Sequence, residues 1–163
     1  MRQHGATLIQ TMLALAVTTI LAQLGSSAYA ELSDDLHAAA CARELAQALR
    51  LARSHALLHE QTVQVRALEQ DWSQGWRVQA MHDSQVLREQ QLACRSKIVG
   101  TAQREIRFSA QGVPLGGHAA LRNGTLHICR RGQPDSRYQV VWASSGRVSL
   151  RTERLAEPRC AGA

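Results

Sequence analysis

The side chains that could carry chemistry in this chain are seven histidines, four cysteines and a group of arginines toward its carboxyl end. Ser54 and His55 are adjacent on a predicted helix, so they point in different directions and form no nucleophile–base pair. His55 and His59 are followed by Glu60, which are residue types of a metal site, but no third ligand follows at a useful spacing. The sequence contains no phosphate-binding glycine loop. We therefore expect no catalytic residue, metal or cofactor.

The four cysteines, Cys41, Cys94, Cys129 and Cys160, suit disulfides better than zinc. None belongs to a Cys-x-x-Cys pair, and their long spacings are not those of a structural zinc site. An even number of cysteines in an exported chain favours disulfides. Cys41 falls on the apolar face of a predicted helix, and Cys160 lies in a tail that has little else to hold it. These positions predict the pairs Cys41–Cys94 and Cys129–Cys160.

The positive charge of the chain is concentrated toward its carboxyl end. The formal net charge is +6 at pH 7. From Arg104 to Arg159 there are ten arginines and four acidic residues, a difference of +6, so the rest of the chain is neutral. This asymmetry suits an anionic partner, either nucleic acid or lipid headgroups. A solvated surface that keeps the domain soluble is the alternative.

The amino-terminal stretch decides whether these residues are held at a membrane. From Gln3 to Ala30 the sequence contains no charged side chain and is predominantly apolar. A helix rises about 1.5 Å per residue, so about 20 apolar residues cross a bilayer core. The stretch Ala6–Ala30 is therefore long enough for one span. Gln10 and Gln23 would need polar partners there, because an unpaired amide is costly in hydrocarbon.

Two interpretations of this stretch are open from its residues alone. In the first it is a secretory signal peptide, with Arg2 as the charged start and Ala28-Tyr29-Ala30 as a cleavage site before Glu31. In the second a short basic leader ends at Gly5 and the apolar helix is retained. The first predicts a soluble protein, and the second predicts a membrane-anchored one.

The next segment, Glu31–Glu60, is predicted to be an amphipathic helix. Its apolar residues recur at intervals of three and four, which is one face of a helix with 3.6 residues per turn. They are Ala38, Cys41, Leu45, Leu49, Ala52 and Ala56. Because proline is absent from Met1 to Val113, this helix and the apolar stretch before it can form one continuous helix, with Gly25 as its weak point.

After His59 the pattern changes to short alternating segments bounded by turn residues, which is typical of antiparallel strands. The candidate strands, of which we expect seven or eight to form, lie at 62–66, 76–80, 86–88, 97–99, 106–108, 119–122, 125–129, 138–143 and 147–152. Asn123-Gly124 is expected to join two of them as a hairpin, since both positions tolerate positive φ. Ser144-Ser145-Gly146 is expected to join the last two. A helix followed by such strands is an α+β arrangement.

Six short blocks, in order along nearly the whole chain, resemble the GspH/FimT family of pilin-like proteins. The first runs from Gly5 to Gln10 and resembles the processing site of type IV prepilins, usually Gly-Phe-Thr-Leu-Ile-Glu. Ala6 replaces the usual Phe, and Gln10 replaces the usual Glu. The other blocks are Ala52–Ala56 with Val63–Val65, Trp72–Trp76, Phe108–Gly112, Leu126–Cys129 and Ser145–Val148.

The resemblance favours cleavage after Gly5 and implies a pilin-like fold. That fold is α+β, with a long amino-terminal helix, its first half transmembrane, packed on small antiparallel sheets. The resemblance implies a leader at residues 1–5, a transmembrane and assembly segment at 6–30, and a periplasmic domain at 31–163. A prepilin peptidase would cut after Gly5 and methylate Ala6. The protein would cross the bacterial inner membrane once and assemble with other pilins or pseudopilins through its helix.

Gln10 stands at an assembly position of the family. The resemblance implies that the usual glutamate there pairs with the terminal amine of a neighbouring subunit. Gln10 can accept a hydrogen bond from that amine but brings no charge.

Two functions follow from the resemblance. One is a minor pilin of a type IV pilus that contributes to DNA uptake in natural transformation, and the other is a minor pseudopilin of a type II secretion system without DNA binding. Some FimT-type members are implicated in DNA binding through a late Gly-Arg-x-Arg motif. Gly146-Arg147 matches it, Ser149 replaces the second arginine, and Arg151 follows.

The predicted pattern of the last strand and tail gathers arginines near one end of the domain. Arg147 and Arg151 face outward if Val148 and Leu150 face the core. A Cys129–Cys160 bridge would then bring the tail close to the end of an earlier strand. This patch suits contacts to the phosphates of double-stranded DNA without base readout. The candidate DNA-binding residues are Arg130, Arg131, Arg147, Arg151 and Arg154.

Overall fold

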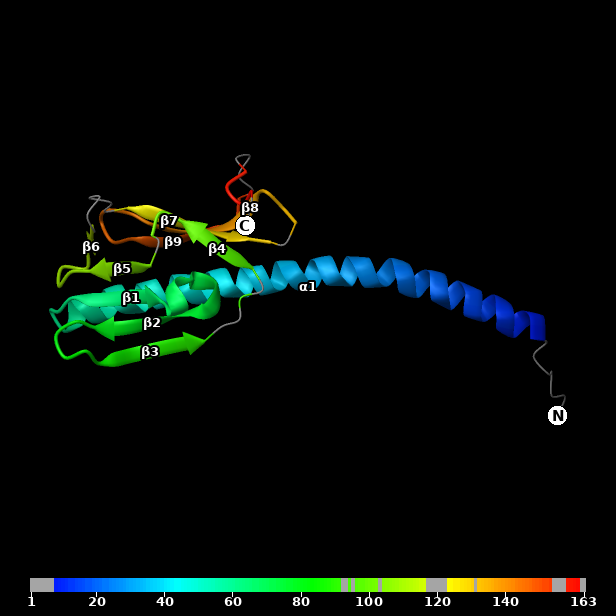
Figure 1. Cartoon of the computed structure of the whole chain (residues 1–163), viewed down its shortest axis with the longest axis horizontal. Helices are drawn as coiled ribbons and strands as arrows, with labels where there is room; N and C mark the ends of the chain where they lie inside the picture. The colour runs from blue at the N-terminus through cyan, green and yellow to red at the C-terminus, as the bar shows by residue number, and fades with distance from the viewer. Residues whose placement is uncertain are drawn as a thin grey trace. The chain divides into compact units, whose positions relative to one another are not determined.

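The computed structural model describes residues 8–91, 94, 96–102, 104–116, 123–130, 132–153 and 158–161. Within them it contains one α-helix, two single-turn 3₁₀ segments and nine strands, which confirms the α+β fold (Figure 1). The chain consists of two compact units, Met1–Asp34 and Asp35–Ala163.

The helix α1 runs from Leu8 to Leu58, 51 residues, as the absence of proline allows. In the second unit its apolar face is buried, and all six residues of the predicted stripe, Ala38, Cys41, Leu45, Leu49, Ala52 and Ala56, are almost inaccessible to solvent. Most of them are small, so the strands can approach the helix closely.

Two antiparallel sheets form the rest of this unit. The five-stranded sheet has the order β3-β2-β1-β5-β6, and the four-stranded sheet has the order β4-β7-β8-β9. The strands of the first sheet are β1 (Val63–Ala67), β2 (Gly75–Ala80), β3 (Val86–Gln91), β5 (Glu105–Phe108) and β6 (Pro114–Leu115). Those of the second are β4 (Lys97–Gly100), β7 (Gly124–Cys129), β8 (Ser136–Trp142) and β9 (Val148–Arg151).

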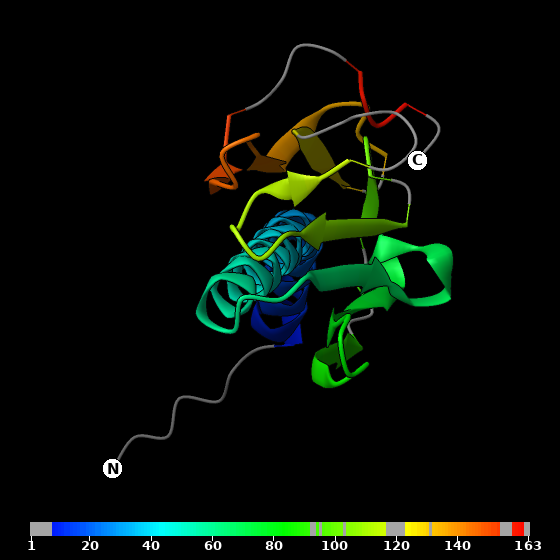
Figure 2. The same cartoon turned by 90° about the vertical axis from the view of Figure 1, so that its left-hand side faces the viewer.

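Helix and sheets share one hydrophobic core. Alternate residues of the central strands face it, such as Val63 and Val65 of β1 and Leu126 and Ile128 of β7. Figure 2 shows the strands of the two sheets on two adjoining sides of the helix. Trp72 is buried in this core, where its indole Nε1 donates to the carbonyl of Ala102 at 2.9 Å. Trp72 is therefore a core residue, and its ring is not available to stack on a nucleic-acid base.

The structure differs from the predicted strands in two places. The two-residue strand β6 was not predicted, because Pro114 and Leu115 carry no alternating pattern and pair only through β5. The hairpin predicted at Asn123-Gly124 is not supported, since β7 has β4 on one side and β8 on the other. Its expected partner at 119–122 lies outside the described residues. The last hairpin is confirmed, as β8 and β9 pair across Ser144-Ser145-Gly146.

Candidate functional site

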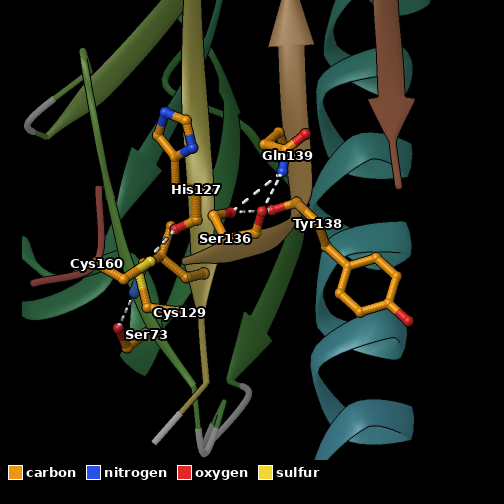
Figure 3. The surroundings of a disulfide bond; sticks show 8 residues. Ser73, His127, Cys129, Ser136, Tyr138, Gln139 and Cys160 are labelled. Atoms are coloured by element: carbon orange, nitrogen blue, oxygen red, sulfur yellow. Dashed lines mark hydrogen bonds between the residues drawn. A yellow bond between two sulfur atoms is a disulfide. The ribbon is translucent and has the colours of Figure 1, made fainter. Parts of the chain in front are cut away.

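The structure contains two disulfides, with the pairings that the sequence predicts. Cys41, on the buried face of α1, is bonded to Cys94 in the connection between β3 and β4. Cys129, at the end of β7, is bonded to Cys160 in the carboxyl-terminal tail (Figure 3). The amide of Cys160 also donates to the carbonyl of Pro134 at 2.9 Å. The first bridge thus anchors the helix, and the second anchors the tail.

Three of the sequence blocks meet where the helix contacts two turns. The Nε of Arg53 donates to the carbonyl of Gly112 at 3.1 Å, and its Nη2 donates to the carbonyl of Ser145 at 3.3 Å. Gly146 has a φ of +80°, and a Cβ on it would overlap the carbonyl oxygen of Gly112. These residues belong to the Ala52–Ala56, Phe108–Gly112 and Ser145–Val148 blocks. The blocks therefore specify how the helix is joined to both sheets.

A second polar junction lies around Asp35, the first residue of the second unit. Its carboxylate accepts hydrogen bonds from Arg130 at 3.3 Å, from Arg137 at 3.2 Å and from the hydroxyl of Tyr138 at 3.0 Å. Burial, with the hydrogen bond to Asp35, raises the pKa of Tyr138 above its usual value. No local sequence pattern predicts this cluster, because Asp35 is separated from Arg130, Arg137 and Tyr138 by 95, 102 and 103 positions.

The Asp35 cluster corrects the prediction for Arg130. That residue was expected to take part in an exposed DNA-binding group. Its side chain is only 8% exposed, and its guanidinium is bonded to Asp35 and to the side-chain oxygen of Gln133. It therefore presents little charge to a partner.

Arg147 and Arg151 are exposed at the two ends of β9. Val148 is buried and Leu150 packs on the core, so the side chains of β9 alternate as the sequence pattern predicts. Beside this strand, the Nε of Arg50 on α1 donates to the carbonyl of Val148 at 3.3 Å. The structure thus adds a guanidinium of the helix to this region. The other two candidates, Arg131 and Arg154, lie outside the described residues.

The amino-terminal part of α1 presents apolar side chains to solvent. Leu8, Ile9, Met12, Leu13, Leu15, Val17, Ile20 and Leu21 are between 48% and 77% exposed. In the described part of the chain, α1 is the one helix that is long and apolar enough to cross a membrane. Gln10 lies on it and is exposed. Gly5 and Ala6, the expected cleavage and methylation residues, lie outside the described residues.

The histidines at the carboxyl end of α1 are stacked on each other. The ring centroids of His55 and His59 are 4.1 Å apart. Burial, together with His59, lowers the pKa of His55, and Asp83 opposes this shift. Among the described residues, no group of three histidine, cysteine or acidic side chains is arranged to hold a metal ion.

The chain is similar to known pilin-like proteins. Residues 42–146 match a model of the GspH family, described as type II transport protein GspH. Two crystal structures of the type IV minor pilin FimU of Pseudomonas aeruginosa share its fold, each with a TM-score of 0.61 over 73% of this chain. The structures are 20% and 21% identical in sequence to this chain, which covers 92% and 98% of them. No curated protein matches the chain. The match over most of the domain, together with the helix and its two sheets, shows that this chain belongs to the GspH family of pilin-like proteins.

Proposed function

We propose that this protein is a minor pilin of a type IV pilus, assembled through the apolar amino-terminal part of α1. The observation that carries the proposal is the row of exposed apolar side chains from Leu8 to Leu21. Such a surface is unfavourable in water, and a helix satisfies its own backbone hydrogen bonds in lipid. It would be covered by the membrane before assembly and by the helices of other pilins afterwards.

The proposed division of the chain follows from this assembly. Residues 1–5 are the leader that a prepilin peptidase removes, with methylation of Ala6. Residues 6–30 cross the inner membrane and enter the fibre, where Gln10 accepts a hydrogen bond from a neighbouring subunit. Residues 31–163 form the periplasmic domain, and the two disulfides suit that oxidising compartment. We propose no catalytic role.

The alternative is a minor pseudopilin of a type II secretion system, which the description of the matching family favours. The two functions differ in what is lost when the gene is deleted. A minor pilin predicts fewer surface pili, with the protein present in sheared fibres and secretion unchanged. A pseudopilin predicts secreted proteins retained in the periplasm and normal pili. Normal pili and normal secretion together would contradict both.

We further propose that the domain binds double-stranded DNA weakly through the arginines beside β9. Arg147 and Arg151 are exposed, and among the described residues Arg50 bonds only through its Nε, to Val148, so its terminal nitrogens can reach a phosphate. Guanidinium groups form bidentate contacts with phosphate. Contacts of this kind carry no base specificity, so we expect a Kd in the range of about 10⁻⁴–10⁻⁶ M at physiological salt.

The test is a mobility-shift titration of the full-length protein in neutral detergent at two salt concentrations. Arg147→Ala with Arg151→Ala should weaken binding to every sequence alike and flatten its salt dependence. The matched control is Arg88→Ala with Arg104→Ala, two exposed arginines of other strands and turns, which should leave affinity almost unchanged. Equal losses in both double variants would show a general charge effect. No shift of the wild-type protein at low salt would rule out DNA binding.

A further inference from the structure

A hollow of about 290 Å³ opens on the outer face of the five-stranded sheet. Its walls are Arg66 of β1, Arg77 and Gln79 of β2, and the turn Ala67–Gln70 between these strands. The neighbours of the two arginines along their strands, Val65 and Val78, are fully buried. Both arginines therefore point away from the core, into the region of the hollow.

The two arginines are directly opposite each other in the sheet. The register of β1 and β2 pairs Arg66 with Arg77. Like charges at directly opposite positions of an antiparallel pair destabilise it. Arg77 is compensated on its other side, where its Nε donates to a carboxylate oxygen of Glu89 at 2.7 Å. That contact uses its Nε, and its two terminal nitrogens make no hydrogen bond with the described residues.

Arg66, within the described ranges, is not bonded to a carboxylate in this way. The carboxylate beside it in the sheet belongs to Glu105, which is paired with it across β1 and β5. Glu105, however, accepts from the side chain of Gln64 and forms an ion pair with Arg107 at 3.2 Å. In the part of the chain that the structure describes, the guanidinium of Arg66 makes no hydrogen bond or ion pair. A guanidinium that is not bonded to a carboxylate of the described residues therefore lies on the wall of the hollow.

The turn that closes the hollow is strained. Glu69 and Gln70 are consecutive non-glycine residues with φ values of 49° and 65°. Residues of these types occupy the left-handed region at an energetic cost, and such strain is concentrated at ligand clamps and functional sites. This strained turn thus lies at the same hollow as the two opposed arginines.

We propose that this hollow binds a small oxyanion of the carboxylate or phosphate class, held between Arg66 and the terminal nitrogens of Arg77. An anion there would relieve the repulsion between the two guanidiniums, and their planar forks match two oxygen atoms of either class. Glu69 is the one carboxylate among the residues that line the hollow, and it weakens the binding. The site shares no residue with the DNA-binding surface proposed above and requires neither DNA nor a pilus.

The test is a titration of the full-length, disulfide-bonded protein in neutral detergent with inorganic phosphate, and separately with acetate. Chloride keeps the ionic strength constant, and the backbone amide signals of Ala67–Gln70 are followed by NMR. We expect a saturable change with a millimolar midpoint for at least one anion. The two series distinguish the ligand classes, because a carboxylate site saturates at lower acetate concentration and a phosphate site at lower phosphate concentration.

Three variants test the assignment. Arg66→Ala should weaken binding about tenfold, since it removes a charge-assisted contact. Glu69→Gln should tighten it about two- to threefold, since it removes a nearby negative charge at the protein surface. Arg88→Ala, on the same sheet but outside the hollow, should have no effect and serves as the control. A linear, unsaturated response, or equal midpoints in wild type and Arg66→Ala, would overturn the proposal.

Discussion

At the scale of single residues, Gly146 combines a left-handed φ with the closest main-chain contact among the described glycines. Its φ of +80° and its closeness to the carbonyl of Gly112 both exclude a side chain. We expect Gly146→Ala to lower the free energy of unfolding by about 2–4 kcal/mol, because backbone strain adds to a clash with a main chain that cannot move aside. Denaturant unfolding, followed by circular dichroism, measures the loss.

Gly132→Ala is the matched control for this prediction. Gly132 has a similar φ of +69°, but nothing lies within 4 Å of a Cβ built on it. Only the strain remains, so the expected loss is about 1 kcal/mol. Equal losses at both positions would mean that the contact with Gly112 contributes nothing.

Tyr138 should make stability depend on pH in the alkaline range. Its pKa is raised in the folded protein by burial and by the hydrogen bond to Asp35. Folding therefore favours its neutral form. The stabilisation is present in full below the unfolded-state pKa of about 10 and is lost as the pH rises through the folded pKa.

Tyr138→Phe separates this effect from the other alkaline titrations. It should cost about 1–2 kcal/mol at neutral pH, because a carboxylate loses a hydrogen bond, and the cost should shrink as the pH rises above 10. Urea unfolding at pH 7 to 11 measures both. Tyr29→Phe, at a position 74% exposed, is the control and should leave the profile unchanged. A cost that stays constant with pH would contradict the titration of Tyr138.

At the scale of elements, each disulfide joins a segment outside the sheets to a helix or strand of the core: the β3–β4 connection to α1, and the carboxyl-terminal tail to β7. Cys41–Cys94 closes a loop with a sequence separation of 53, and Cys129–Cys160 closes one of 31. In the chain-entropy account each contributes roughly 4 kcal/mol by restricting the unfolded chain. The first also holds α1 against the connection that leads from one sheet to the other.

Replacing each pair by alanine should distinguish these roles. Cys41→Ala with Cys94→Ala should lower the free energy of unfolding by about 4 kcal/mol and expose the whole domain to protease. Cys129→Ala with Cys160→Ala should cost a similar amount but admit cleavage first in the tail, after Arg159. Limited trypsin digestion with mass spectrometry reads out both. Cleavage at the same first site in both variants would show that the second bridge does not anchor the tail.

At the scale of the whole molecule, the two compact units have opposite surfaces. The first exposes a run of apolar side chains, while the second buries most of its own in a core shared by helix and sheets. The proposal that the first unit is retained can be tested by the mass of the mature protein. Protein purified from membranes should begin at Ala6 and carry one methyl group, because the leader is expected to end at Gly5. A chain that begins at Glu31 would show the signal-peptide interpretation to be correct and exclude assembly through the helix.

Local patterns in the sequence were sufficient for much of this structure. The intervals of three and four in the helix predicted its buried face, and the alternation of Val148 and Leu150 predicted which side of β9 faces the core. The place of Cys41 on the apolar face of the helix predicted the first disulfide, and the place of Cys160 in a tail with little else to hold it predicted the second. These features follow from the periods of helix and strand, which the order of residues along the chain determines by itself.

The tertiary structure alone decided which distant residues meet. The pairing of Arg130 with Asp35, the opposition of Arg66 and Arg77, and the place of β7 between β4 and β8 were not predictable. The strand contacts depend on the order of strands in a sheet, and the pairing of Arg130 with Asp35 depends on how α1 packs on the strands. That order is set by the total burial of apolar surface over the whole unit, to which no single local pattern corresponds. An arginine can thus be recognised as charged from the sequence, whereas its partner is determined only by the folded chain.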